Sequence, residues 1–166
     1  MVDIAIRPFE IKDMTAVMGV ILPIQREEFG IAVTAEEQPD LAAIPAFYQS
    51  GNGNFWVAQA DGVIVGTIGL KDIGNRQAAL RKMFVAADFR GGGHGLAGRL
   101  LKTLLEHAVR QDVAEIYLGT TAKFLAAHRF YEKNGFEEIT KLALPAPFPI
   151  MAVDTKFYRT LLSGAR

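Results

Sequence analysis

The chain is 166 residues long and carries 18 Lys and Arg residues against 18 Asp and Glu residues, so its formal net charge at pH 7 is zero. This balance excludes a protein-wide basic field of the kind that holds a nucleic-acid backbone, and it favours small molecules or proteins as partners. The sequence has no cysteine, which excludes disulfides, thiolate metal sites and a thiol nucleophile. The length predicts a single domain, residues 1–166, with one sizeable core.

The apolar stretches of the chain are short. The first ten residues include Asp3 and lack the apolar segment of a signal peptide. The longest uncharged stretches, residues 14–25 and 142–153, are about a dozen residues long, whereas a helix needs about 20 apolar residues to cross a bilayer. We therefore expect a cytoplasmic protein that does not span a membrane.

The first third of the chain predicts one strand and two helices. Residues 2–10 alternate in hydropathy and include Pro8, as expected of a strand. An apolar run that opens at Asp13 predicts a helix that bends near Pro23 and ends around Gly30. Residues 35–49 predict a second, proline-interrupted helix.

The middle of the chain predicts three consecutive strands. Residues 54–72 form two β-rich runs joined by Asp61 and Gly62, the dipeptide typical of a tight type I′ hairpin turn. Residues 78–87 follow a polar turn and predict the third strand.

The last part predicts a helix, a strand, a helix and one final strand. A leucine-rich face over residues 97–108 has helical spacing, and residues 114–121 form a short buried strand. Residues 124–136 predict a helix stopped by Gly135, and the proline-rich residues 144–162 predict a kinked connection to a last strand. This order indicates an α/β (α+β) fold with a single mixed sheet flanked by helices.

A glycine-rich loop precedes the long helix and fits two motifs. Gly93, Gly95 and Gly98 match the G-x-G-x-x-G of dinucleotide sites, but that motif follows a first strand and needs an acid at the end of the next strand. Glu115, at about the right distance, precedes its strand instead. The context therefore disfavours a dinucleotide, and Gly98 is expected to allow close packing of the helix on the sheet.

Read from Arg90, the same loop is R-x-x-G-x-G, which suits a pyrophosphate. Successive glycines let backbone N–H groups turn toward an anion, and the following helix adds unsatisfied N–H donors and its positive dipole end. The alternative is a glycine loop that merely turns a strand into a helix, at an entropic cost of up to about 1 kcal/mol for each glycine.

Two segments resemble the signatures of the GNAT family of N-acetyltransferases. Residues 80–101, "LRKMFVAADFRGGGHGLAGRLL", look like the family's strand, phosphate loop and helix. Residues 126–139, "AAHRFYEKNGFEEI", look like its second motif, and the element order is similar over residues 2–162. The resemblance implies a single mixed, mostly antiparallel sheet that is splayed at its centre and flanked by helices.

The resemblance also implies a binding mode for acetyl-CoA as co-substrate. The pyrophosphate would be held by the loop residues Arg90, Gly91, Gly92, Gly93, His94, Gly95 and Leu96. The pantetheine arm would pair with the backbone of Met83, Phe84 and Val85, a contact in which side-chain identity matters little.

Tyr131 matches the tyrosine that many family members use to protonate the departing CoA thiolate. Because free tyrosine and thiol pKa values are about 10 and 8.5, a hydrogen bond to the developing thiolate describes this role better than full proton transfer. A packing role is the alternative, since Tyr131 and Phe136 would form the apolar pair of a Schellman cap if Gly135 is left-handed. Many members carry an asparagine about seven residues earlier as a further cofactor contact, and Phe124 at that place lacks the amide that makes this contact.

A base or a water chain should help to deprotonate the acceptor amine, because removing a proton from an amine of pKa about 10.4 costs roughly 4.6 kcal/mol at pH 7. Glu27, Glu28 and Asp72 are the candidates, with Glu28 preferred, although each would also fit a solvated surface carboxylate. Ser50 and Ser163 lack the G-x-S-x-G setting of a serine nucleophile. Direct attack by the amine in a ternary complex is therefore expected.

No metal is expected, since His94, His107 and His128 are too scattered for a metal site, and the last two look like helix-surface residues. The sequence thus predicts an acetyl-CoA-dependent N-acetyltransferase acting on a small-molecule or protein amine. The alternative is a noncatalytic acyl-CoA-binding or regulatory module on the same fold. The acceptor stays open, and the proline-rich tail is a candidate homodimer contact.

Overall fold

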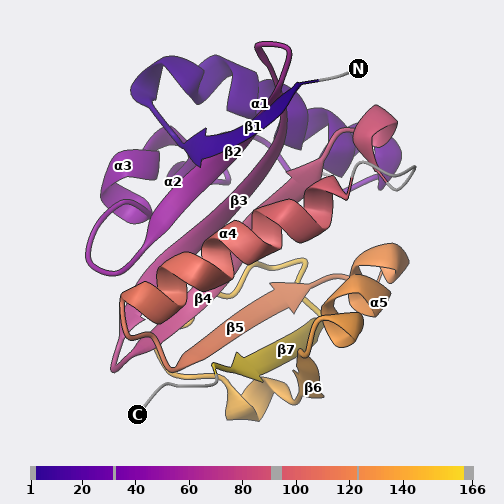
Figure 1. The fold of residues 1–166 in the computed structure, drawn as a ribbon. Helices are drawn as coiled ribbons and strands as arrows, with labels where there is room; N and C mark the ends of the chain where they lie inside the picture. The colour runs from indigo at the N-terminus through magenta and orange to yellow at the C-terminus, as the bar shows by residue number, and fades with distance from the viewer. Residues whose placement is uncertain (1–2, 32, 91–94, 123, 163–166) are drawn as a thin grey trace.

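A computed structural model describes residues 3–31, 33–90, 95–122 and 124–162 of the chain. Their strands form one mixed sheet in the order β1-β2-β3-β4-β5-β7-β6 (Figure 1). The strands are β1 (Ile4–Pro8), β2 (Asn54–Ala60), β3 (Val63–Gly74), β4 (Gln77–Val85), β5 (Glu115–Thr120), β6 (Glu137–Ile139) and β7 (Lys156–Leu161). The β4–β5 pair is parallel and the other neighbouring pairs are antiparallel, as the resemblance implied.

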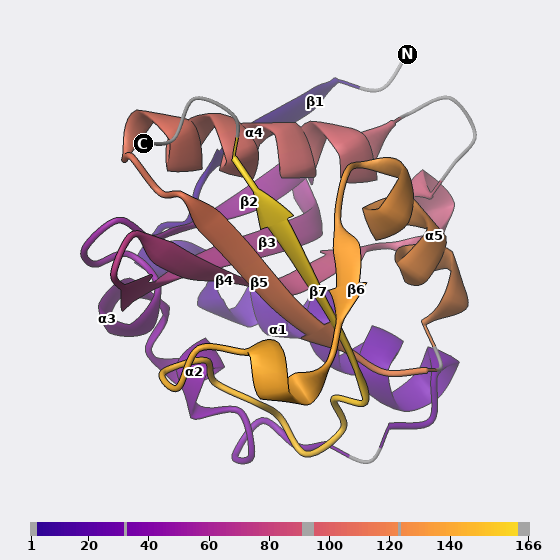
Figure 2. The same ribbon diagram turned by 90° about the horizontal axis from the view of Figure 1, so that it is seen from below.

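Helices cover both faces of this sheet. They are α1 (Met14–Pro23), α2 (Pro39–Ala42), α3 (Ile44–Phe47), α4 (Leu96–Arg110) and α5 (Leu125–Lys133), and a π-helical turn, Ile24–Glu28, continues α1. Figure 2 shows the sheet between α4 on one side and α1 and α2 on the other. Each side has its own apolar core, one centred on the leucines of α4 and one on α1 to α3.

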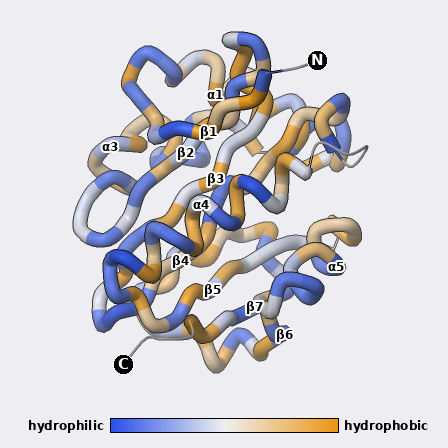
Figure 3. The backbone as a smooth tube through the Cα atoms, viewed as in Figure 1, coloured by the Kyte–Doolittle hydropathy of each residue, from blue (hydrophilic) through white to orange (hydrophobic). Residues whose placement is uncertain are grey.

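The long helix α4 follows directly from its hydrophobic pattern. Its buried side chains, Leu96, Leu100, Leu101, Leu104 and Ala108, recur every three or four residues and lie against β2, β3 and β4. The alternating colours of α4 in Figure 3 reflect this apolar stripe and its polar opposite face. The helix begins at Leu96, just before the predicted leucine-rich face of residues 97–108.

The central hairpin is confirmed. Asp61 and Gly62 both have positive φ, at 50° and 85°, which is the type I′ geometry that the dipeptide predicts. The turn joins β2 to β3 with Ala60 opposite Val63.

Two predicted elements differ in detail. The helix expected over residues 35–49 is split into α2 and α3, because Pro39 and Pro45 each lie in a first turn, where a proline starts a helix more readily than it continues one. The chain also ends in two strands and not one, since β6 follows the α5 turn at once and pairs with β7.

The sheet separates between its two central strands. Strands β4 and β5 pair only over Gln77, Ala78 and Ala79 opposite Glu115, Ile116 and Tyr117, and the rest of β5 pairs with β7 alone. The splay that the family resemblance implied is therefore present. Among the helices of the described residues, none has both the length and the apolar character needed to cross a bilayer.

Candidate active site

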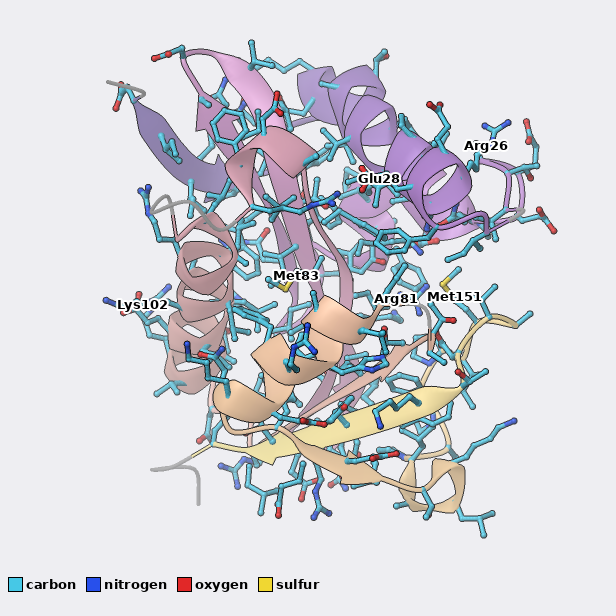
Figure 4. The ribbon with its side chains drawn as sticks, turned by 90° about the vertical axis from the view of Figure 1, so that its right-hand side faces the viewer. Arg26, Glu28, Arg81, Met83, Lys102 and Met151 are labelled. Atoms are coloured by element: carbon cyan, nitrogen blue, oxygen red, sulfur yellow. The ribbon has the colours of Figure 1, made fainter. Side chains whose placement is uncertain are left out.

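A pocket opens where β4 and β5 diverge. Its lining includes residues 80–84 of β4 and 118–121 at the end of β5, together with Gln25, Phe124, Tyr131, Phe148, Met151 and Asp154 from other parts of the chain. Figure 4 shows Arg81 and Met151 near each other, with Met83 farther along toward α4. The pocket thus gathers side chains from the sheet, from α5 and from the proline-rich tail.

A β-bulge shapes the β4 wall of this pocket. The β3–β4 register shifts between Thr67 and Gly69, opposite Lys82, and Lys82 has a left-handed φ of 56°. The buried Thr67 hydroxyl donates a 2.7 Å hydrogen bond to the Lys82 carbonyl. Because a bulge breaks the alternation of side chains along a strand, consecutive residues 80–84 of β4 can all line the pocket.

Tyr131 contributes its hydroxyl to the same pocket. The ring is buried, and the hydroxyl donates toward the Met83 sulfur at 3.7 Å. Burial raises the pKa of the Tyr131 hydroxyl well above its usual range. The group therefore stays protonated and acts as a hydrogen-bond donor at neutral pH.

The packing role of Tyr131 is present as well. Gly135 has a φ of 91°, and the Phe136 N–H donates to the Tyr131 carbonyl at 3.0 Å, which is the six-to-one bond of a Schellman cap. The rings of Tyr131 and Phe136 are 5.5 Å apart. The ring fixes the end of α5 while its hydroxyl remains in the pocket.

Phe124 gives the pocket an aromatic side chain where many family members have asparagine. Its ring contacts Phe29 at 4.5 Å and Phe84 at 6.4 Å between centroids. An apolar aromatic contact thus takes the place of an amide.

The predicted pyrophosphate site, Arg90 to Leu96, is described at its two ends but not in its middle. Residues Gly91, Gly92, Gly93 and His94 lie outside the described part of the chain. Gly95 precedes α4 with a φ of 58°, and its carbonyl accepts the first intrahelical bond, from the Arg99 N–H at 3.0 Å. The N–H groups of the first helical turn, beginning at Leu96, therefore point out of the helix end, as an anion site requires.

Glu28 lies in an ion pair outside the pocket lining. The Arg90 guanidinium donates to both of its carboxylate oxygens, at 2.7 and 3.0 Å, and a further 2.8 Å bond joins Arg90 Nε to the Val85 carbonyl. Both side chains are more than a third exposed. This pair connects the turn after α1 to Arg90, the first residue of the predicted phosphate loop.

The other two predicted base candidates also stay apart from the pocket. Glu27 is exposed on the same turn. The Asp72 carboxylate accepts N–H bonds from Asn52 at 3.0 Å and Gly74 at 2.8 Å, so it stabilises the loops at the far end of β3.

A buried polar cluster that the sequence did not predict borders the pocket. The Tyr48 hydroxyl donates to Asp40 Oδ2 at 2.6 Å and accepts from Arg81 Nε at 3.1 Å. Lys82 Nζ lies 3.6 Å from the same Asp40 oxygen, and burial lowers the pKa of the Lys82 ammonium to about 8. The signal in the sequence was the adjacent cations Arg81 and Lys82 inside an otherwise apolar strand.

The structure differs from the sequence expectation at three further residues. His128 is buried, with its Nε2 2.9 Å from the Thr121 carbonyl, and is not a surface residue. His107 is half-buried and approaches the Asn52 carbonyl at 2.9 Å. Gly98 is exposed and a Cβ there would meet nothing within 4 Å, so it does not serve close helix packing, because it lies on the outer face of α4.

Within the described residues, no group of three or more His, Cys, Asp or Glu side chains is arranged to hold a metal ion. The described part of the site offers the Tyr131 hydroxyl, the cluster around Lys82 and the backbone N–H groups at the start of α4.

Comparison with known proteins places this geometry in a family. The profile of the acetyltransferase (GNAT) family matches residues 20–136. A crystal structure of a GNAT acetyltransferase from Staphylococcus aureus superposes with a TM-score of 0.93 and 38% identity, covering 96% of this chain and 99% of that one.

Among curated proteins, N-acetylaspartate synthetase of Danio rerio is 36% identical over 102 residues, which is 60% of this chain and 36% of that protein. Probable N-acetyltransferase family 8 member 5 of Mus musculus is 34% identical over 109 residues, or 63% of this chain and 47% of that protein. The chain thus spans less than half the length of these two curated relatives. The protein belongs to the acetyltransferase (GNAT) family.

Proposed function

We propose that this protein transfers an acetyl group from acetyl-CoA to a primary amine by direct attack within a ternary complex. The observation that carries the proposal is the pocket at the gap between β4 and β5, which is lined by residues 80–84 of β4 and by Tyr131, whose hydroxyl donates toward Met83. A thioester in this gap would have a hydrogen-bond donor beside its sulfur. Family membership and the N-acetyltransferase names of the relatives support the same reaction.

In this proposal the donor lies along β4 with its phosphates at the start of α4. The backbone of Met83, Phe84 and Val85 would pair with the pantetheine amides as an added strand. The N–H groups at Gly95 and Leu96, together with the preceding loop from Arg90 to His94, would receive the pyrophosphate. The positive end of the α4 dipole favours an anion at that place.

Tyr131 would stabilise the leaving thiolate. Because its pKa is raised by burial, the hydroxyl is a weaker acid than free tyrosine, and complete proton transfer to a thiolate of pKa about 8.5 is unfavourable. A hydrogen bond that strengthens as negative charge develops on sulfur is the more effective contribution. In the structure the Tyr131 hydroxyl donates toward the Met83 sulfur, which is the same element as the thiolate sulfur that it would stabilise.

The acceptor is proposed as a small molecule or protein that presents a primary amine. The name of the Danio rerio relative makes L-aspartate the first amine to test. Other amino acids, polyamines and peptides with a free N-terminus cover the remaining classes.

The test is a screen for CoA release against this amine panel. The protein has no cysteine, so a thiol reagent detects only the CoA that is released. We expect saturable turnover with at least one amine, together with acetyl-CoA binding by calorimetry that Gly95→Glu abolishes and Gly98→Ala spares. Binding that is unaffected by Gly95→Glu would refute the proposed donor site. Acetyl-CoA binding without turnover of any amine would support a noncatalytic acyl-CoA-binding module instead.

A further inference from the structure

We propose that Lys82 is the base that takes a proton from the acceptor ammonium group, and that Asp40 passes this proton toward the outer surface. The inference rests on the proposed acetyl transfer and names a residue for a step that acetyl transfer requires. Lys82 lies in a strand of the β-sheet, and it lines the reaction pocket.

The Lys82 ammonium is removed from water and has few partners. Its side chain is 2% exposed. Nζ lies 3.6 Å from Asp40 Oδ2 and 3.4 Å from the thioether sulfur of Met151, which is a weak acceptor. A charged ammonium with one carboxylate at ion-pair distance and a sulfur as its other neighbour is poorly solvated, so the neutral amine is readily formed.

The charges around Lys82 shift the balance between its ammonium form and its neutral amine form. Asp40 from α2 and Asp154 from the tail stabilise the ammonium, while the neighbouring Arg81 destabilises it, and burial outweighs them all. The Tyr48 hydroxyl faces Asp40 and is itself held protonated by burial. The resulting pKa of about 8 for Lys82 lies near neutral pH, where a general base is most effective.

Asp40 lies between the pocket and a second depression. That depression is lined by Asp40, Arg81 and Met151 and by the exposed residues Glu37, Pro39 and Ile150. Arg81 and Met151 also line the reaction pocket, so the two depressions share a wall, and Asp40 stands at it. The Asp40 carboxylate therefore lies between Lys82 and the second depression, through which the proton of Lys82 would leave.

The bulge and the Tyr48 contacts hold this pair in place. Thr67 fixes the left-handed backbone of Lys82 through its carbonyl. The Tyr48 hydroxyl donates a hydrogen bond to Asp40 and accepts one from Arg81. Arg81 also donates to the Pro149 carbonyl at 2.7 Å. Tyr48, Arg81 and Thr67 are positioning residues, whereas Lys82 would touch the substrate.

Acetyl transfer removes two protons from the nitrogen of the acceptor ammonium group. The acceptor ammonium gives one proton to neutral Lys82, and the freed amine attacks the thioester carbonyl carbon. The C–N bond forms and the C–S bond breaks, and the second nitrogen proton ends on the CoA sulfur beside Tyr131. The proton on Lys82 then leaves by way of Asp40, so each turnover releases one proton to solvent.

The experiment compares Lys82→Met, Asp40→Asn and the control Lys102→Met, a lysine on the exposed face of α4 (Figure 4). CoA release is followed from about pH 6 to pH 10, with L-aspartate and with whichever panel amine the wild type uses best. Acetyl-CoA binding is measured by calorimetry. Lys82→Met keeps about the length of the side chain but removes the ammonium beside the buried Asp40, so its fold is checked by its melting temperature.

We expect kcat of the wild type to rise with pH through an inflection near 8. Lys82→Met should lower kcat at pH 7 by about 100-fold or more and abolish that inflection, while the acetyl-CoA Kd stays within about twofold. Asp40→Asn should move the inflection to lower pH, because it removes a charge that stabilises the Lys82 ammonium. Lys102→Met should behave as wild type.

An inflection that persists near pH 8 in Lys82→Met, or a kcat within about threefold of wild type, would overturn the role of Lys82 and leave acetyl transfer standing. An inflection unmoved in Asp40→Asn would overturn the coupling to Asp40. If the wild type turns over no amine, the proposed function itself fails and the role of Lys82 fails with it.

Discussion

The hydroxyl oxygen of Tyr131 lies 3.7 Å from the sulfur of Met83, across the gap where β4 and β5 separate. The tyrosine comes from the last turn of α5, and the methionine comes from the bulged part of β4. Their contact puts one protonated oxygen at a place that acetyl-CoA would reach from β4. It also separates the two roles of the tyrosine, because the ring packs on Phe136 and the hydroxyl does not.

Tyr131→Phe should therefore lower the catalytic rate and leave the fold unchanged. The ring of phenylalanine preserves the Schellman pair with Phe136, so the free energy of unfolding should change by less than about 1 kcal/mol. We expect kcat to fall by about 10- to 100-fold because the developing thiolate loses its donor. Steady-state kinetics and calorimetry check this, with the acetyl-CoA Kd expected to stay the same; a matching loss of binding and turnover would argue for a structural role.

Two glycines of the phosphate segment should respond in opposite ways to alanine. Gly95 has a left-handed φ of 58°, so Gly95→Ala should cost about 1–2 kcal/mol of stability. Gly98 is helical, exposed and surrounded by open space, so Gly98→Ala should add about 0.5–1 kcal/mol. Urea unfolding of both variants measures these changes. Loss of acetyl-CoA binding in Gly98→Ala would instead favour the dinucleotide interpretation of the loop.

The ion pair between Arg90 and Glu28 should matter more for the donor than for proton removal. Glu28→Gln should lower stability by no more than about 1 kcal/mol, since both side chains are partly exposed. We expect the KM for acetyl-CoA to rise by a few-fold, because Arg90 leads into the phosphate loop, while kcat changes little. A loss of about 100-fold in kcat with an unchanged KM would instead identify Glu28 as the base.

The pair of Arg7 and Asp13 should make stability depend on acid pH. Two bonds from Arg7, at 2.8 and 2.9 Å, and one from the Glu10 N–H lower the pKa of Asp13. Because the folded pKa is depressed, the stabilisation is fully present above the unfolded value of about 3.9 and is lost as the pH falls through the folded pKa.

Asp13→Asn should consequently destabilise the protein by about 1–3 kcal/mol at pH 7. Urea unfolding at pH 7 and near pH 3 gives the comparison, and the difference between wild type and variant should shrink at the lower pH. A difference that stays constant between the two pH values would mean that the carboxylate charge is not its source.

Local sequence determined the elements whose geometry depends on neighbouring residues alone. Asp61 and Gly62 specified their turn, the leucine spacing specified α4, and Gly135 with Phe136 specified the cap that orients Tyr131. These features are encoded within a few residues, because turn dihedrals, helical periodicity and cap hydrogen bonds are short-range properties. The two family motifs likewise indicated the acyltransferase fold and the place of the donor.

Tertiary structure alone decided which polar groups meet in the pocket. Asp40 of α2 lies 3.6 Å from Lys82 of β4, and Glu28, in the turn after α1, is paired with Arg90, which also bonds the Val85 carbonyl at the end of β4. No local pattern encodes such contacts, since they depend on how distant segments are packed. The sequence by itself determined the main secondary-structure elements and the motifs of the proposed donor site. Long-range packing determined the ionisation of Lys82, because burial in the folded core sets its pKa.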